Sequence, residues 1–223
     1  MAVTARTIPP TERRTQAQRR AESEHRILQA AAELFGEQGY VDTTMEQIGA
    51  RAGFSAALIA RKFGSKPGVI EALLAAIRRN TAGAIDPNGD RDVVDVVRRY
   101  VAMIADGNVW SRALYVLMAE SVGPLRDKAE LFAKHNRSFI ATLAAGIARA
   151  QRDGRANPDA KARPLATELV ARIRGITLLW LIDPTVDFAG MTARLIDELQ
   201  DTLRPAGTAA RRKSLRTLEG GKR

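Results

Sequence analysis

Two short segments of the chain, 44–52 and 56–62, have the residue types and spacing of a DNA-recognition unit. Thr44 begins a Thr-Met-Glu-Gln pattern typical of a helix N-terminus, Gly53 can end that helix, and Ser55 can cap the next one. In a helix–turn–helix the first helix braces the second, and the second presents its exposed face to the major groove. The spacing by itself fits DNA binding and a purely structural pair of helices equally well.

The second of these segments is predicted to divide its side chains between two faces. Ile59 and Phe63 have the spacing of buried positions on a helix. The outward and flanking positions are the candidates for DNA contact, namely Ala57, Ala60, Arg61, Leu58 and Lys62. Arginine and lysine would supply charge for phosphates or base edges, and the small apolar side chains would suit thymine methyl groups.

No set of residues typical of catalysis or metal binding is found in the sequence. The chain has no cysteine and only two histidines, which excludes thiolate chemistry and a histidine metal cluster. The segment 64–66, Gly-Ser-Lys, lacks the upstream glycine of a phosphate-binding loop. Asp197, Glu198 and Asp201 fit a solvated helix face better than an acid–base pair. We therefore expect no enzyme activity, no cofactor and no metal.

The formal net charge of +10 is concentrated at the two ends of the chain. Residues 1–26 carry six basic and three acidic side chains, and residues 205–223 carry six and one. The N-terminal arm, with Arg13, Arg14, Arg19 and Arg20, is placed to enter a minor groove or follow phosphates. For the basic tail, extra DNA attraction and simple solvation both stay open. No signal-like or membrane-length apolar segment is seen, so a cytoplasmic protein without membrane contact is expected.

The sequence predicts an all-α fold of about nine helices. Alanine, leucine, arginine and glutamate dominate, and no sustained two-residue alternation is present. The first helix should end at Gln38, with Gly39 as a left-handed cap and Tyr40 folded back. The helix after Ser65 should carry a buried stripe of Val69, Leu73 and Ile77. Five further helices are expected at about 91–107, 110–121, 125–153, 161–182 and 187–203.

Several of these residues together resemble the DNA-binding region of the TetR family of bacterial transcriptional regulators. They are Ile27 to Ala31, Phe35, Gly39-Tyr40, Thr43-Thr44, Ile48, Ala52 to Ser55 and Phe63 to Lys66. The resemblance implies that Thr44 and Lys66 contact DNA phosphates. The full set of expected DNA-binding residues is Arg19, Arg20, Thr44, Ser55, Ala56, Ala57, Leu58, Ala60, Arg61, Lys62 and Lys66.

The second helix of the unit departs from the family pattern. The family often has Gly-Thr-Leu-Tyr-x-His-Phe where this chain has Ala-Leu-Ile-Ala-Arg-Lys-Phe at 57–63. Leu58, Ala60 and Lys62 replace the usual threonine, tyrosine and histidine. We therefore expect a different operator sequence from those typical of the family, while DNA binding itself is still expected. The same departure motivates an alternative, a helical small-molecule-binding protein whose DNA-binding heads are degenerate.

The resemblance also implies a C-terminal half that binds a small effector and forms a homodimer. Expected effector contacts are Trp110, Leu114, Met118, Phe132, His135, Asn136 and Phe139, although apolar rows at this spacing also suit an ordinary core. Expected dimer contacts are Leu169, Ile173, Thr177, Trp180, Leu195 and Leu199. The implied function is a repressor that binds a roughly palindromic operator of double-stranded DNA and is released by the effector.

These expectations divide the chain into four parts. A flexible basic arm covers 1–20, and a helix–turn–helix domain with its linking helix covers 21–82. An effector-binding and dimerisation bundle of about five helices covers 83–204, and a basic tail covers 205–223.

Overall fold

The computed structural model describes residues 15–85 and 91–205, and nearly all of these lie in helices. The described residues form nine α-helices, one short 3-10 turn at 126–128 and no strand. The helices are α1 (Gln16–Gln38), α2 (Met45–Ala52), α3 (Ala56–Phe63), α4 (Lys66–Ile85), α5 (Val93–Ala105), α6 (Val109–Glu120), α7 (Ala129–Arg152), α8 (Ala162–Ile182) and α9 (Phe188–Leu203). The predicted all-α class is confirmed.

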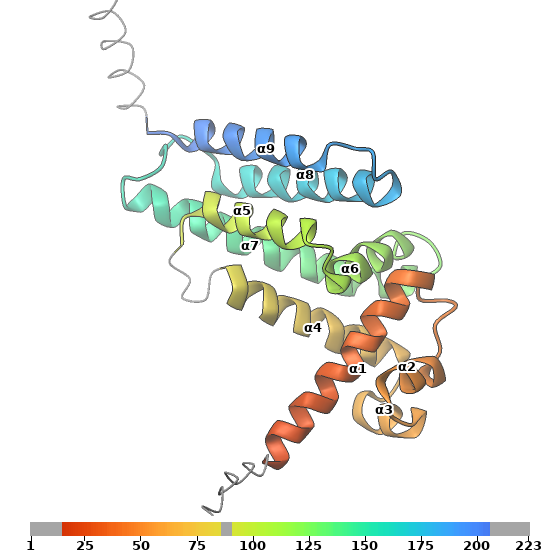
Figure 1. The fold of residues 1–223 in the computed structure, drawn as a ribbon. Coiled ribbons are helices and arrows are strands. Elements are labelled where there is room, and N and C mark those ends of the chain that lie inside the picture. The colour runs from red at the N-terminus through yellow and green to blue at the C-terminus, as the bar shows by residue number, and fades with distance from the viewer. Residues whose placement is uncertain (1–14, 86–90, 206–223) are drawn as a thin grey trace, which may run out of the picture.

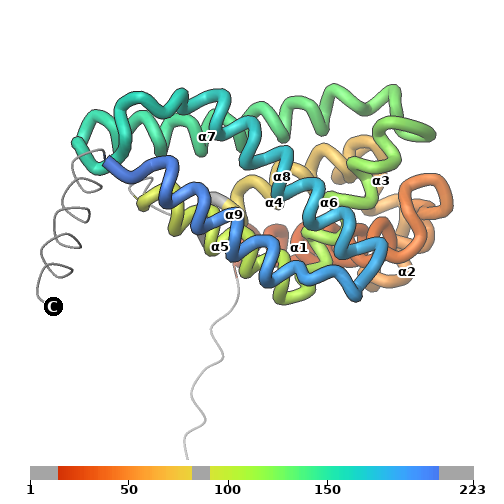
Figure 2. The backbone as a smooth tube through the Cα atoms, turned by 90° about the horizontal axis from the view of Figure 1, so that it is seen from above, coloured from red at the N-terminus to blue at the C-terminus, as the bar shows by residue number. Residues whose placement is uncertain are grey.

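The helices are arranged as a small N-terminal group and a larger bundle. Figure 1 shows α2 and α3 at one end of the molecule and α8 and α9 at the opposite end, with α4 to α7 between them, while α1 runs past α4 and alongside α2. Figure 2 shows α5 beside α9 and α7 beside α8, and both pairs are in contact. None of the helices described is both long enough and apolar enough to cross a membrane.

The first helix follows from its local sequence. Thr15 forms a capping box with Gln18, in which each side chain accepts a hydrogen bond from the other residue's backbone. The predicted stripe is fully buried, with Ile27, Ala31, Leu34 and Phe35 each at most 4% exposed. Gly39 has the expected positive φ of 79°, but its ψ is −176°. The chain therefore leaves α1 in an extended conformation and not in the predicted left-handed one. Tyr40 folds back as predicted, with its ring centroid 6.2 Å from that of Phe35.

Two hydrophobic clusters hold the molecule together, and α6 contributes to both. The first, called here the head core, joins buried side chains of α1 to α4 with Ala113, Leu114 and Leu117 of α6. The second, the body core, joins α5 and α7 to α9 with Tyr115 of α6. Because successive residues of α6 enter different cores, the two groups of helices are packed against each other through this helix.

Some expectations fall on residues that the structure does not describe. They are the arm with Arg13 and Arg14, the boundary at 86–90, and the tail from 206 to 223. The four-part division of the chain stays a prediction.

Candidate functional sites

The α2–α3 turn has the geometry of a helix–turn–helix, because the backbone of α2 lies in direct contact with the backbone of the turn that leads into α3. Gly53 lies in the left-handed region, with φ 74° and ψ 36°, and Phe54 donates a 2.9 Å hydrogen bond to the carbonyl of Gly49. A Cβ on Gly49 would lie 2.6 Å from the carbonyl oxygen of Phe54. Only glycine permits this approach, so the packing of α3 on α2 depends on position 49.

Both helices of the unit begin at the capping residues that the sequence predicted. The Thr44 hydroxyl accepts from the Gln47 backbone at 3.2 Å, and the Gln47 side chain accepts from the Thr44 backbone at 2.7 Å. The Ser55 hydroxyl accepts from the Leu58 backbone at 3.2 Å. Both capping side chains are exposed at these helix N-termini, which suits a phosphate contact. Such a contact stays a prediction.

The faces of α3 are those expected from its spacing. Ile59 is fully buried and Phe63 is half-buried, whereas Ala57, Ala60 and Arg61 are exposed. Ala56 and Leu58 are half-buried at the start of the helix. Arg61 forms no hydrogen bond or ion pair with any described residue, so its guanidinium is available to an external partner.

Lys62 is placed differently from Arg61, because it connects α3 to α1. Its Nζ donates to the carbonyl of Arg20 at 3.0 Å and lies 3.3 Å from Oε2 of Glu24. This contact holds the part of α1 around the exposed Arg20 against α3. The same region carries Glu24, which pairs with Lys62 and with Arg79.

Lys66 holds the loop between α1 and α2. Its Nζ donates to the carbonyls of Tyr40 at 2.7 Å and Thr43 at 2.6 Å, and it lies 4.1 Å from the centroid of the Tyr40 ring. Burial lowers the pKa of Lys66, while the carboxylates of Glu120 and Asp42 oppose that shift. The ammonium thus positions the loop that leads into Thr44, a role that its type and sequence position did not indicate.

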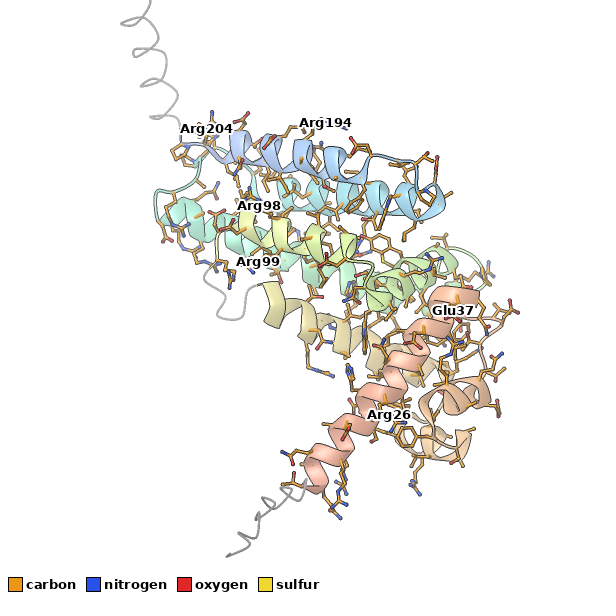
Figure 3. All side chains as sticks on the ribbon, viewed as in Figure 1. Arg26, Glu37, Arg98, Arg99, Arg194 and Arg204 are labelled. Carbon is orange, nitrogen blue, oxygen red and sulfur yellow. The ribbon has the colours of Figure 1, made fainter. Side chains whose placement is uncertain are left out.

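Arg26 of α1 binds the C-terminal end of α2 and the turn that follows it. Its Nη2 donates to the carbonyl of Ala52 at 2.8 Å, and its guanidinium lies 4.9 Å from the centroid of the Phe54 ring. A cation at the last carbonyls of a helix satisfies groups that the helix itself leaves unpaired. Figure 3 shows this side chain on the part of α1 that faces α2 and α3.

The structure separates the predicted effector contacts into two groups. Trp110, Leu114, Met118 and Phe132 lie in or against the head core, where α6 and α7 meet α1 and α4. Trp110 donates from Nε1 to Oε1 of Gln29 at 2.8 Å and stacks on His25 with centroids 5.7 Å apart. His135, Asn136 and Phe139 lie further along α7. None of the seven lines the cavity described below, and their contact with an effector stays a prediction.

The second group surrounds a side chain that the sequence did not single out, Arg174 of α8. Its Nη1 donates to the Tyr100 hydroxyl at 2.7 Å, and its Nη2 lies 3.4 Å from Nε2 of His135. The guanidinium lies 5.0 Å from the ring centroid of Tyr115 and 5.8 Å from that of Phe139. The sequence offered only a weak signal, because Arg174 shares the apolar run of α8 with a second arginine, Arg172.

A small cavity lies next to this group, between the end of α5, the start of α6 and the second half of α8. Its volume is about 110 Å³. Its lining residues are Ile104, Gly107, Asn108, Ser111, Arg112, Tyr115, Thr177, Trp180 and Leu181. Tyr115 belongs both to this lining and to the surroundings of Arg174.

The predicted dimer contacts require a correction. Leu169, Ile173, Thr177, Leu195 and Leu199 are each at most 2% exposed, because they pack into the protomer's own body core. The prediction is wrong for these five residues, and Trp180 is half-buried against Phe188. α8 is apolar on two faces. One face packs into the body core, and the opposite face is exposed. It carries Ala171, Gly175, Leu178, Leu179 and Ile182.

The fold and the α2–α3 geometry define a helix–turn–helix protein, and comparison with known proteins shows which regulators it resembles. Residues 27–73 match the family model of the bacterial regulatory proteins, tetR family. The HTH-type transcriptional repressor Rv3405c of Mycobacterium tuberculosis is 31% identical over 122 residues, which are 55% of this chain and 61% of that protein. The match thus spans about three-fifths of that relative's length. The similarity is therefore to regulators of the tetR family, over residues 27–73 for the family model and over 55% of the chain for this relative.

Solved structures agree with this similarity at the level of the fold. TylP, a TetR regulator from Streptomyces fradiae, superposes with a TM-score of 0.73 at 20% identity, covering 92% of this chain and 100% of that one. SmeT, the repressor of the Stenotrophomonas maltophilia multidrug efflux pump SmeDEF, gives a TM-score of 0.67 at 20% identity, covering 82% and 92%. The similarity therefore extends through the C-terminal bundle.

Proposed function

We propose that the protein is a transcriptional repressor that binds operator DNA as a homodimer and releases it when a small molecule binds. The observation that carries the DNA-binding part is the outward face of α3. Arg61 is exposed there without a described partner, and Lys62 holds the part of α1 around the exposed Arg20 against α3. A related protein of Mycobacterium tuberculosis is itself named a transcriptional repressor.

The test of DNA binding is fluorescence polarisation of the purified full chain with labelled duplexes from the DNA adjoining its own gene. We expect a saturable complex at moderate salt that survives an excess of non-specific competitor, because base contacts add specificity to the phosphate attraction. Failure to form a selective complex on any of these duplexes would contradict the repressor function. It would favour the alternative of a helical small-molecule-binding protein with degenerate heads.

The homodimer is supported by the exposed face of α8. Leu178, Leu179 and Ile182 are 39%, 53% and 73% exposed, and the small Ala171 and Gly175 continue the same face. A contiguous apolar face on a helix costs free energy in water and is typical of a protein interface. Pairing this face across a two-fold axis would set the distance between two α3 helices to about one turn of DNA.

The ligand response is supported by the position of α6. Arg112 lines the cavity and its Nε donates to the Gly36 carbonyl of α1 at 3.0 Å, while Glu120 accepts from the Tyr40 backbone at 2.8 Å. A ligand that shifts α6 would therefore shift α1 and the attached α2–α3 unit. Only a ligand with different affinities for the two arrangements changes DNA binding. SmeT, which shares the fold, has been solved with triclosan.

A further inference from the structure

The bundle contains an enclosed cationic group without an anionic partner. Arg174 is half-buried as a residue, but its Nε is shut off from solvent and has no hydrogen-bond partner. Its guanidinium interacts with the Tyr100 hydroxyl and with His135, and no described carboxylate pairs with it. Arginine stays protonated at any physiological pH, so this charge is permanent.

Two further donors beside Arg174 also lack acceptors. Burial, and then the charges of Arg174 and Arg78, lower the pKa of His135 to about 3, so its imidazole is neutral. Because its Nε2 faces the donating guanidinium, we assign the proton to Nδ1, which has no partner. The buried hydroxyl of Tyr115 has none either. Unpaired buried donors are costly, so such a group suits an acceptor-rich ligand.

The surroundings of these donors restrict the chemistry of that ligand. Three aromatic rings flank the guanidinium, those of Tyr100, Tyr115 and Phe139, at 5.8, 5.0 and 5.8 Å from their centroids. They offer faces to an apolar or aromatic body. Of the two other arginines nearby, Arg112 on the cavity lining already donates from Nε to the Gly36 carbonyl, and Arg78 acts on His135. A guanidinium flanked by rings favours an anion with an apolar body over a small, strongly hydrated phosphate.

The neighbouring cavity supplies room for such a body. Tyr115 both flanks Arg174 and lines the cavity, and Thr177, one turn further along α8, lines it too. Its volume of about 110 Å³ is of the order that holds a single aromatic ring.

We propose that this group of residues binds an organic monoanion, a carboxylate on a small aromatic body. The carboxylate accepts from Arg174 and from the Tyr115 hydroxyl, and the ring occupies the cavity that Tyr115 also lines. The proposal rests on the ligand response proposed above and gives the chemical class of the effector.

The test compares benzoate with benzamide, a neutral probe of nearly the same shape, in thermal unfolding of the full chain. At concentrations on the order of 10 mM and constant ionic strength, we expect benzoate to raise Tm by about 2–4 °C and benzamide to leave it unchanged. Arg174→Met should abolish the benzoate shift. Because it removes an uncompensated cation, it should itself unfold at a Tm no lower than that of the wild type.

Two further variants keep the test decisive. Arg172→Met removes a half-buried arginine of the same helix, α8, which pairs with Glu198 of α9, and its benzoate shift should equal that of the wild type. Arg174→Lys keeps the charge but loses the planar two-donor geometry, and it should bind benzoate about tenfold more weakly. It also replaces Arg174→Met in the comparison if that variant does not fold.

Equal shifts with benzoate and benzamide, an unchanged benzoate shift in the Arg174 variants, or no benzoate shift in the wild type would each overturn the proposal. These outcomes are separate from the DNA experiment. A benzoate shift that depends on Arg174, together with no selective DNA complex, would uphold the anion site and contradict the repressor function.

Discussion

Nε1 of Trp110 on α6 donates a 2.8 Å hydrogen bond to Oε1 of Gln29 on α1. The next residue along α6, Ser111, lines the cavity that lies next to the residues around Arg174. α6 therefore connects the bundle directly to the DNA-binding unit, as α4 also does, and this hydrogen bond joins residues 81 positions apart in the chain. Such a direct link explains how an event in the bundle could move α1 without any change in the α2–α3 turn.

The Trp110 link should contribute measurably to stability. Trp110→Phe keeps an aromatic side chain but leaves the half-buried Gln29 amide without this donor. We expect the free energy of unfolding in urea to fall by about 1 kcal/mol more than for Trp180→Phe, whose indole forms no hydrogen bond with any residue of 15–85 or 91–205. Equal losses at the two tryptophans would show that the hydrogen bond adds nothing.

The close approach of α4 to α3 should make Gly68 indispensable. A Cβ there would lie 1.9 Å from the carbonyl oxygen of Phe63, so Gly68→Ala must displace α3 from the head core. We expect a loss of more than about 2 kcal/mol in the free energy of unfolding. Gly146→Ala in α7 is the matched control, because its new Cβ would meet Val93 at an ordinary 3.6 Å. A comparable loss in the control would contradict this account.

Arg61 should contribute to operator affinity by direct contact. Arg61→Ala is expected to weaken selective binding by about 1–3 kcal/mol if the guanidinium contacts a base, measured by polarisation on operator and scrambled duplexes. Arg51→Ala serves as the control, because Arg51 lies on α2 and pairs with Glu37 at 2.7 Å. An equal loss on both duplexes would instead assign Arg61 to a phosphate.

The exposed face of α8 should govern oligomeric state. Leu179→Glu places a charge on a side chain that is 53% exposed, so the fold of the protomer should persist while the interface is disrupted. We expect analytical ultracentrifugation to shift from dimer to monomer. Val122→Glu, at an 88% exposed apolar residue after α6, should leave the dimer intact. A Leu179→Glu variant that still sediments as a dimer would place the interface elsewhere.

His135 should make stability fall in mild acid. Its pKa is lowered from 6.5 to about 3 by burial and by the facing cations Arg174 and Arg78, so below pH 6.5 the unfolded chain binds a proton that the folded chain does not. Its contribution to stability is therefore complete above pH 6.5 and is lost as the pH falls toward 3, at no more than about 1.4 kcal/mol per pH unit. His135→Gln should flatten the pH dependence of the free energy of unfolding by this amount. An unchanged slope would mean that protons reach the imidazole in the folded protein.

The sequence by itself determined the local structure of this protein. The caps at Thr44 and Ser55 and the turn at Gly53 involve partners within a few residues, so residue type and spacing were sufficient to predict them. The same holds for the burial of Ile59 and the exposure of Arg61, because one side of α3 is plainly more apolar than the other.

Only the tertiary structure decided which distant residues meet. Lys66 binds carbonyls 23 and 26 residues away, and Arg174 meets side chains from α5, α6 and α7. On α8 both faces are apolar, so periodicity could not indicate that Leu169 faces the body core while Leu179 faces outward. Helical spacing identifies residues that share a face, but the covering of that face depends on the packing of the other helices.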